Sequence, residues 1–124
     1  MNIRDNILSL KEEISDEVKL VAVSKTRSID EIKEVYNSNQ KIFGENRVQE
    51  IVEKHQLLPD DIEWHMIGHL QKNKVKYISN FISLIHSLDR ISLAKEIDKY
   101  AKKSNREIDC LIQLKISSEE TKFG

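Results

Sequence analysis

The segment LVAVSKT at residues 20–26 decides the fold class of this sequence. Residues 20–23 form a short, continuous apolar run with β-branched members, a pattern typical of a parallel strand that is covered on both faces. Similar runs recur along the chain, at residues 41–44, 64–67, 82–88 and 110–116. Helical patterns of apolar residues separate these runs, so the sequence predicts five parallel strands joined by four helices.

A further helix is predicted ahead of the first strand. Over residues 2–14 the apolar residues recur at spacings of four, three and four, which places them on one face of an amphipathic helix. After the first strand, Ser28 and Glu31 have the spacing of a capping box, in which two side chains satisfy backbone N–H groups at the start of a helix. The chain therefore alternates helix and strand along its length.

Two architectures fit this α/β pattern: a doubly wound open sheet, or part of a (β/α)8 TIM-type barrel. The doubly wound dinucleotide fold is disfavoured because SKTR at residues 24–27 follows the first strand, where a G-x-G-x-x-G turn is required, and no Walker A loop is present. A complete barrel has eight strands and typically about 250 residues. With 124 residues and five strands, we expect an incomplete barrel with a leading N-terminal helix.

The composition excludes several classes of protein. Twenty Lys and Arg residues against 21 Asp and Glu give a net charge of −1, whereas nucleic-acid-binding proteins rely on excess positive charge. Cys110 is the only cysteine, so neither an intrachain disulfide nor a multi-cysteine zinc site can form. No apolar stretch approaches the roughly 20 residues of a membrane-spanning helix, and the first residues lack the apolar region of a secretory signal. We expect one cytoplasmic domain with no metal, membrane or nucleic-acid partner.

Lys25 is the first candidate for chemistry. It lies just after the first predicted strand, at the carboxyl end, where parallel α/β proteins place their ligands. In partly apolar surroundings a lysine loses some of its preference for the charged form, and its neutral amine can form a Schiff base with an aldehyde. The alternative, judged from spacing alone, is an ordinary solvated lysine in a loop.

Gly44 and Asn46 follow the second predicted strand at the same end. The glycine permits a sharp turn or a close approach of the backbone to a ligand, and the asparagine can present its amide to that ligand. Asn46 and Gln49 also have the spacing of a helix N-cap, which is the alternative interpretation of the same residues.

Histidines lie on two further strands. Alternation along the third strand places Trp64 and Met66 on one face and His65 on the other, so that His65 reaches the interior of a barrel. The alternative is a hydrogen-bonded histidine of the core. A zinc site is disfavoured, because His65 and His69 lack a third ligand. The fourth strand ends at His86-Ser87-Leu88-Asp89, where adjacent serine and histidine make no catalytic triad and Asp89 is interpreted as a helix cap. Cys110 is expected to be a small, buried apolar residue.

Four segments together resemble the pyridoxal phosphate homeostasis protein family. They are AVSKT at 22–26, FGENRVQE at 43–50, WHMIGHLQKNK at 64–74 and HSLD at 86–89, and the final segment 118–124 is also similar to the one that follows the fifth strand in that family. Members of the family resemble single-domain relatives of the alanine racemase barrel. The resemblance implies that Lys25 holds pyridoxal 5′-phosphate (PLP) as a Schiff base, with Asn46 beside the cofactor. It further implies a cytoplasmic role in vitamin B6 homeostasis without a demonstrated turnover reaction.

The resemblance also predicts what the chain lacks. Family members continue with the remaining strands of the barrel, a loop containing serine and glycine, and an Arg-x-Gly segment, which hold the cofactor phosphate. Phosphate sites of barrels generally come from the loops after strands 7–8. Residues 1–124 are therefore interpreted as the N-terminal part of a single PLP-binding barrel domain, and we expect weak PLP binding. Unpaired strand edges and an open core face favour self-association.

Two alternative functions remain at this point. The first is a barrel enzyme that uses Lys25 as a Schiff-base nucleophile, such as an amino-acid racemase. The second is an RNA- or protein-interaction domain that uses the lysines at 72, 74 and 76, although balanced total charge favours a solvated helix face there.

Overall fold

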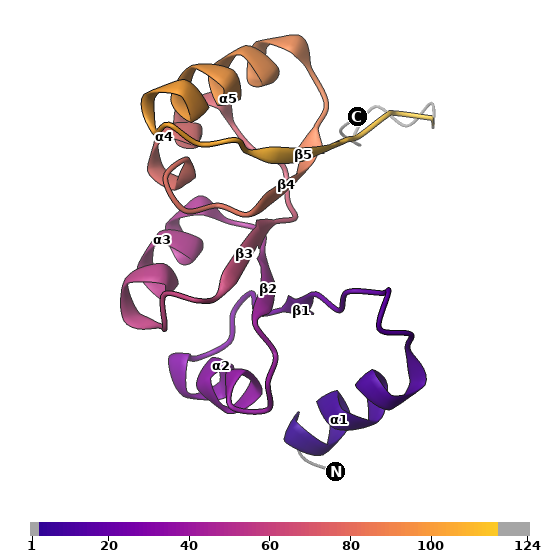
Figure 1. The fold of residues 1–124 in the computed structure, drawn as a ribbon. Helices are drawn as coiled ribbons and strands as arrows, with labels where there is room; N and C mark the ends of the chain where they lie inside the picture. The colour runs from indigo at the N-terminus through magenta and orange to yellow at the C-terminus, as the bar shows by residue number, and fades with distance from the viewer. Residues whose placement is uncertain (1–2, 117–124) are drawn as a thin grey trace.

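The computed structural model describes residues 3–116 and shows a curved parallel sheet with helices along it (Figure 1). Segment 118–124, which contributed to the family resemblance, lies outside the described residues. In chain order the elements are α1 (Ile3–Glu13), β1 (Ala22–Val23), α2 (Ile29–Tyr36), β2 (Ile42–Glu45), α3 (Val48–Leu57), β3 (Glu63–Met66), the 3₁₀ helix η1 (Lys72–Lys74), α4 (Val75–Ile78), β4 (Leu84–Leu88), α5 (Ile91–Lys103) and β5 (Asp109–Ile112).

The order of the strands decides between the two architectures. The sheet runs β1-β2-β3-β4-β5, and every neighbouring pair is parallel. A doubly wound sheet reverses its strand order at a switch point, whereas a barrel adds each strand beside the previous one. Helices α2 to α5 also lie on one face of the curved sheet (Figure 1). The predicted incomplete barrel is therefore confirmed for residues 3–116, and the doubly wound alternative is wrong.

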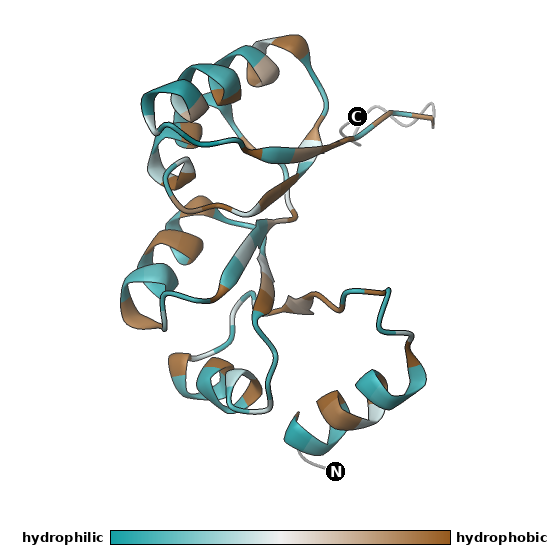
Figure 2. Cartoon of the chain, viewed as in Figure 1, coloured by the Kyte–Doolittle hydropathy of each residue, from teal (hydrophilic) through white to brown (hydrophobic). Residues whose placement is uncertain are grey.

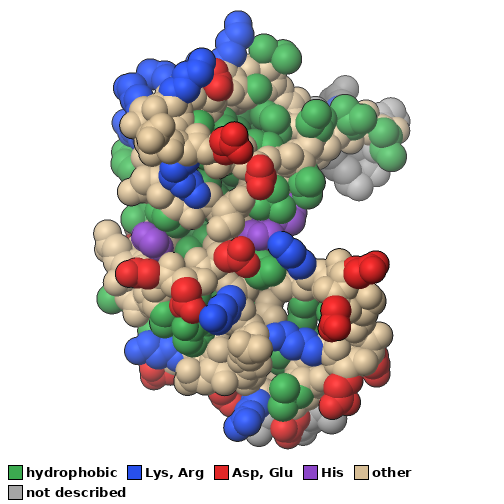
Figure 3. Space-filling model, viewed as in Figure 1, with side chains coloured by type: hydrophobic (Ala, Val, Ile, Leu, Met, Phe, Trp, Pro, Cys, Tyr) green, Lys and Arg blue, Asp and Glu red, His purple; other side chains and the backbone are tan. Residues whose placement is uncertain are grey.

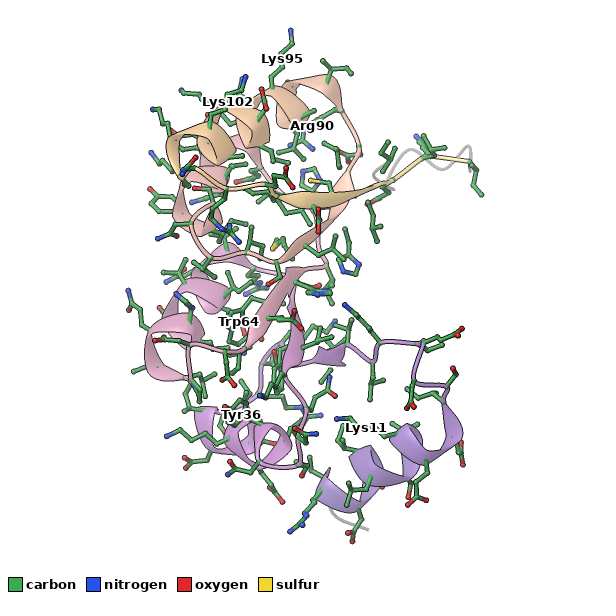
Figure 4. The ribbon with its side chains drawn as sticks, viewed as in Figure 1. Lys11, Tyr36, Trp64, Arg90, Lys95 and Lys102 are labelled. Carbon is green, nitrogen blue, oxygen red and sulfur yellow. The ribbon has the colours of Figure 1, made fainter. Side chains whose placement is uncertain are left out.

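The hydrophobic core lies between the sheet and helices α2 to α5. Strand alternation sends Trp64 and Met66 to the helix side, as predicted, and Trp64 packs against Phe43 with ring centroids 5.9 Å apart (Figure 4). Each helix carries both apolar and polar residues, as expected for helices with only one side on the sheet (Figure 2). The residues buried from the helix side are chiefly Ile32, Ile51, Val75, Ile78, Leu93 and Ile97.

Local signals in the sequence account for some element boundaries and not for others. The capping box at the start of α2 is present, with Ser28 and Glu31 bonded reciprocally. The last strand is shorter than predicted, because β5 pairs with β4 only as far as Ile112. Beyond that pairing, Leu114 is 75% exposed and Ile116 is 95% exposed. The apolar run thus predicts that a strand forms in this segment, but the strand ends where its pairing with the neighbouring strand ends.

The two ends of the sheet are exposed edges within the described residues. Val23 of β1 is 53% exposed and Ile112 of β5 is 76% exposed. Helix α1 buries none of its residues, although Ile7 lines an apolar groove beside Val35 of α2. The exposed edges agree with the reasoning that led to self-association, which itself stays a prediction. Within residues 3–116 no helix has both the length and the hydrophobicity needed to cross a bilayer.

Candidate functional site

The carboxyl ends of β1 and β2 bring the two predicted site residues to the same level of the sheet. Val23 pairs with Gly44 across these parallel strands. Lys25 and Asn46 each lie two residues beyond that pair, so both follow their strands at equivalent positions. Parallel α/β proteins form ligand sites at this end of the sheet because successive strand-to-helix connections meet there.

Lys25 occupies a tight turn between β1 and α2. The turn is closed by the N–H of Arg27, which donates to the carbonyl of Ser24 at 3.1 Å. Thr26 has a φ of 63°, a left-handed conformation that is rare for a β-branched residue. The Lys25 side chain is exposed, so the partly apolar surroundings expected from the sequence are not formed by the described residues. Its primary amine is accordingly open to a reactant from solution.

A cluster of charges, formed by buried Glu45, buried Lys54 and partly buried Glu50, lies under this turn. The Lys54 ammonium of α3 donates to Glu45 Oε2 at 2.7 Å, to Glu50 Oε2 at 3.0 Å and to the Ser24 carbonyl at 2.7 Å. Glu45 is completely buried and also accepts a hydrogen bond from the Ser24 hydroxyl. Glu50 accepts a further bond at 3.0 Å from the N–H of Thr26. The cluster therefore joins β1, β2 and α3 through groups on both sides of Lys25.

The cluster perturbs its two carboxylates in opposite directions. Burial raises the pKa of Glu45, although the hydrogen bonds from Lys54 and Ser24 oppose that effect. The hydrogen bond from Lys54, followed by that from the Thr26 amide, lowers the pKa of Glu50. Sequence analysis missed this cluster. The available signal was Lys54 itself, which lies three residues after buried Ile51 on the sheet-facing side of α3, where a lysine needs a partner.

The interpretation of Asn46 as a helix cap is wrong. Helix α3 has Arg47 at its N-cap position, and no side chain caps it. The backbone of Asn46 lies against Gly68, where a Cβ would come within 2.8 Å of the Asn46 carbonyl oxygen. Gly44 makes room for side chains rather than for a sharp turn, since a Cβ there would lie 3.1 Å from Ile67 and Val21.

Two histidines meet on the face of the sheet that the helices leave open. His65 of β3 and His86 of β4 are hydrogen-bonded, with Nδ1 of the first 3.0 Å from Nε2 of the second. The predicted position of His65 on the barrel interior is confirmed, because its helix-side neighbours Trp64 and Met66 are buried in the core. Figure 3 shows a hollow on the right of the view, with histidine side chains at its inner edge. Within residues 3–116 no three metal-ligating side chains gather.

The histidine pair makes stability depend on pH. Burial lowers the pKa of both rings, and for His65 the neighbouring His86 and Lys19 lower it further while Glu63 raises it. The unfolded chain therefore takes up protons first as the pH falls. We expect the free energy of unfolding to decline as the pH falls below 6.5, the ordinary pKa of histidine. Urea titrations at pH values from about 8 down to about 5, on both sides of that value, measure the decline.

A paired variant isolates this effect from other titrating groups. The double variant His65→Gln with His86→Gln removes the proton uptake of both rings. Its free energy of unfolding is therefore expected to depend less steeply on pH than that of the wild type. An identical slope in the two proteins would show that these rings titrate alike in the folded and unfolded states.

Asp89 and Cys110 both have structural contacts, which differ from the expected role for Asp89 and are close to it for Cys110. Asp89 does not cap α5, whose N-cap position is occupied by Arg90 without a capping side chain. Its carboxylate instead accepts from the Arg90 guanidinium at 2.6 Å and lies 3.8 Å from His69 Nδ1. Cys110 is half-buried against the core, and burial raises the pKa of its thiol. Neither contact brings these residues to the Lys25 turn.

Comparison with known proteins establishes the family. Residues 1–122 match the family model for the alanine racemase N-terminal domain. The chain belongs to this family. Its five-stranded arc with helices on one side accordingly has the alanine racemase N-terminal fold as an incomplete barrel, as the strand order had indicated.

Individual relatives support the narrower resemblance found in the sequence. The chain is 52% identical, over 86% of its length, to the pyridoxal phosphate homeostasis protein of Aquifex aeolicus, and covers 47% of that protein. It is 36% identical, over its whole length, to the protein of the same name from Haemophilus influenzae, and covers 58% of it. The chain thus spans about half the length of the curated relatives it matches.

Solved structures agree with these relatives. PipY of Synechococcus elongatus without PLP is 36% identical, with a TM-score of 0.92 over 99% of this chain and 58% of PipY. PipY with PLP bound has a TM-score of 0.88 over 95% of this chain and 57% of PipY. The two matches to PipY therefore cover at least 95% of this chain.

Proposed function

We propose that this chain binds PLP and takes part in intracellular PLP homeostasis in the cytoplasm, with Lys25 as the attachment residue and Asn46 beside the cofactor. The observation that carries the proposal is the exposed primary amine of Lys25 at the carboxyl end of β1, in a chain whose relative PipY has been solved with PLP bound. Homologues named pyridoxal phosphate homeostasis protein support the cellular role.

The residues present suit this cofactor. When bound, PLP supplies an aldehyde, with which a primary amine condenses with loss of water. Lys25 provides such an amine with open access, and Asn46 lies at the equivalent level just after the neighbouring strand β2. The ammonium of Lys54 is bonded to Glu45, Glu50 and the Ser24 carbonyl, whereas the Lys25 amine is exposed and can meet a ligand.

We further propose that PLP binding by this chain alone is weak. Barrel phosphate sites come from the loops after strands 7–8. The sheet formed by residues 3–116 has five strands, so the described residues contribute attachment and ring contacts but not that phosphate site.

Reductive trapping tests the attachment residue. The chain is incubated with saturating PLP, reduced with borohydride and digested, and the label is assigned to peptides by mass spectrometry. We expect the label to concentrate on the peptide that contains Lys25, about tenfold above the exposed lysines elsewhere, which corresponds to about 1.4 kcal/mol of preference. Lys25→Ala is expected to abolish that label.

Lys33→Ala serves as the matched control, because Lys33 is an exposed lysine in the last turn of α2. It is expected to keep the Lys25 label unchanged. Label spread evenly over the surface lysines, or concentrated on another residue, would refute the assignment of Lys25.

A further inference from the structure

We propose that Glu50 is a positioning residue for Lys25 and that Lys54 fixes Glu50 for this task. This inference rests on the proposed function, since it concerns the residue that attaches PLP. It assigns a role to the charged cluster of Glu45, Glu50 and Lys54.

The first argument is that both peptide groups beside Lys25 are tied to α3. On one side, the Ser24 carbonyl accepts from the Lys54 ammonium at 2.7 Å. On the other, the Thr26 N–H donates to Glu50 Oε2 at 3.0 Å. The same carboxylate oxygen accepts from Lys54 at 3.0 Å, so one charged pair holds the backbone before and after Lys25.

The second argument is the strain in the turn. A left-handed backbone at Thr26, with φ at 63°, persists only where its surroundings hold it. The bond from the Thr26 N–H to a carboxylate is charge-assisted, and such bonds are shorter and stronger than neutral ones. Glu50 thus stabilises a conformation of the turn that an isolated loop would not keep.

The third argument is that the backbone around Lys25 is held by its neighbours while the Lys25 side chain is exposed. Lys54 is buried and Glu45 is fully buried, while Lys25 is exposed. A reactive group is placed most accurately when its backbone is fixed by neighbouring residues and its side chain is left open to the ligand. Holding the turn beforehand also reduces the ordering that must occur when a ligand binds.

The test compares Glu50→Ala with Glu50→Gln, which keeps an amide oxygen as acceptor, and with Glu53→Ala, which removes an exposed carboxylate one turn along α3. The first readout is hydrogen exchange of the Thr26 amide, measured by NMR without PLP. The second is the rate of borohydride-trapped PLP labelling at Lys25 relative to Lys33.

Glu50→Ala is expected to accelerate Thr26 exchange and to slow relative labelling of Lys25, each by about tenfold. Glu50→Gln is expected to restore part of both, and Glu53→Ala to change neither. Unaltered labelling of Lys25 in Glu50→Ala would overturn this inference alone. Failure of the wild-type chain to label at Lys25 would overturn the proposed function and this inference with it, whatever the Thr26 amide does.

Discussion

Replacing Lys54 with methionine is expected to lower the free energy of unfolding by about 3–5 kcal/mol. Methionine retains much of the side-chain volume but removes the ammonium that compensates Glu45, which is completely buried. One oxygen of that carboxylate, Oε1, already has no hydrogen-bond partner within residues 3–116. The variant would therefore leave a buried carboxylate with only the Ser24 hydroxyl as partner, or force it to take up a proton. Chemical denaturation followed by circular dichroism measures the change.

Two further variants separate charge from packing. Changing both partners, as Lys54→Met with Glu45→Met, removes the uncompensated charge and is expected to recover most of the lost stability, because apolar replacements of a whole buried pair are often neutral. Lys99→Met is the exposed control: its ammonium lies 3.9 Å from Glu96 at the surface of α5, where a pair contributes at most about 1 kcal/mol. A double variant as unstable as the single one would show that side-chain shape, rather than charge, accounts for the loss.

The elements of this fold that depend on local pattern could be predicted from the sequence. Alternation in β3 placed Trp64 in the core and His65 on the open face, and both positions are confirmed. The capping box of Ser28 and Glu31 requires only residues three apart, and it formed as expected. Strand alternation and helix capping each depend on a few neighbouring residues, so they can be recognised in the sequence without knowledge of distant contacts.

The elements that depend on distant contacts could not be predicted in the same way. The cap assigned to Asn46 is wrong, since Arg47 holds the N-cap position of α3, and the backbone of Asn46 lies against Gly68, which follows β3. Lys54 meets Ser24 across 30 positions of sequence, and nothing near either residue indicates the other. Only part of the candidate site could therefore be predicted. Lys25 and Asn46 follow strand ends, whereas the residues that hold the Lys25 turn come from the packing of α3 against the sheet.

Gly68→Ala is expected to destabilise the chain by about 1–3 kcal/mol, as overpacking of a tight contact does. A Cβ at this position would lie 2.8 Å from the carbonyl oxygen and 3.0 Å from the Cα of Asn46. Both atoms belong to the backbone and cannot rotate away, so the segment after β3 must move away from the segment after β2. Gly68 has no positive φ, and alanine adopts its backbone conformation without strain, so the effect is steric.

Gly44→Ala is the matched substitution, because its Cβ would meet side chains instead of backbone. The nearest atoms, at 3.1 Å, are methyl carbons of Ile67 and Val21, which relieve the contact by small rotations. We expect a cost below about 1 kcal/mol at this position. The two variants also differ at the site: Gly68→Ala displaces Asn46 and should reduce PLP labelling of Lys25 at fixed PLP, measured below the unfolding transition. Equal stability losses in the two variants would mean that the Asn46 backbone yields as readily as a side chain, and that Gly68 does not set its position.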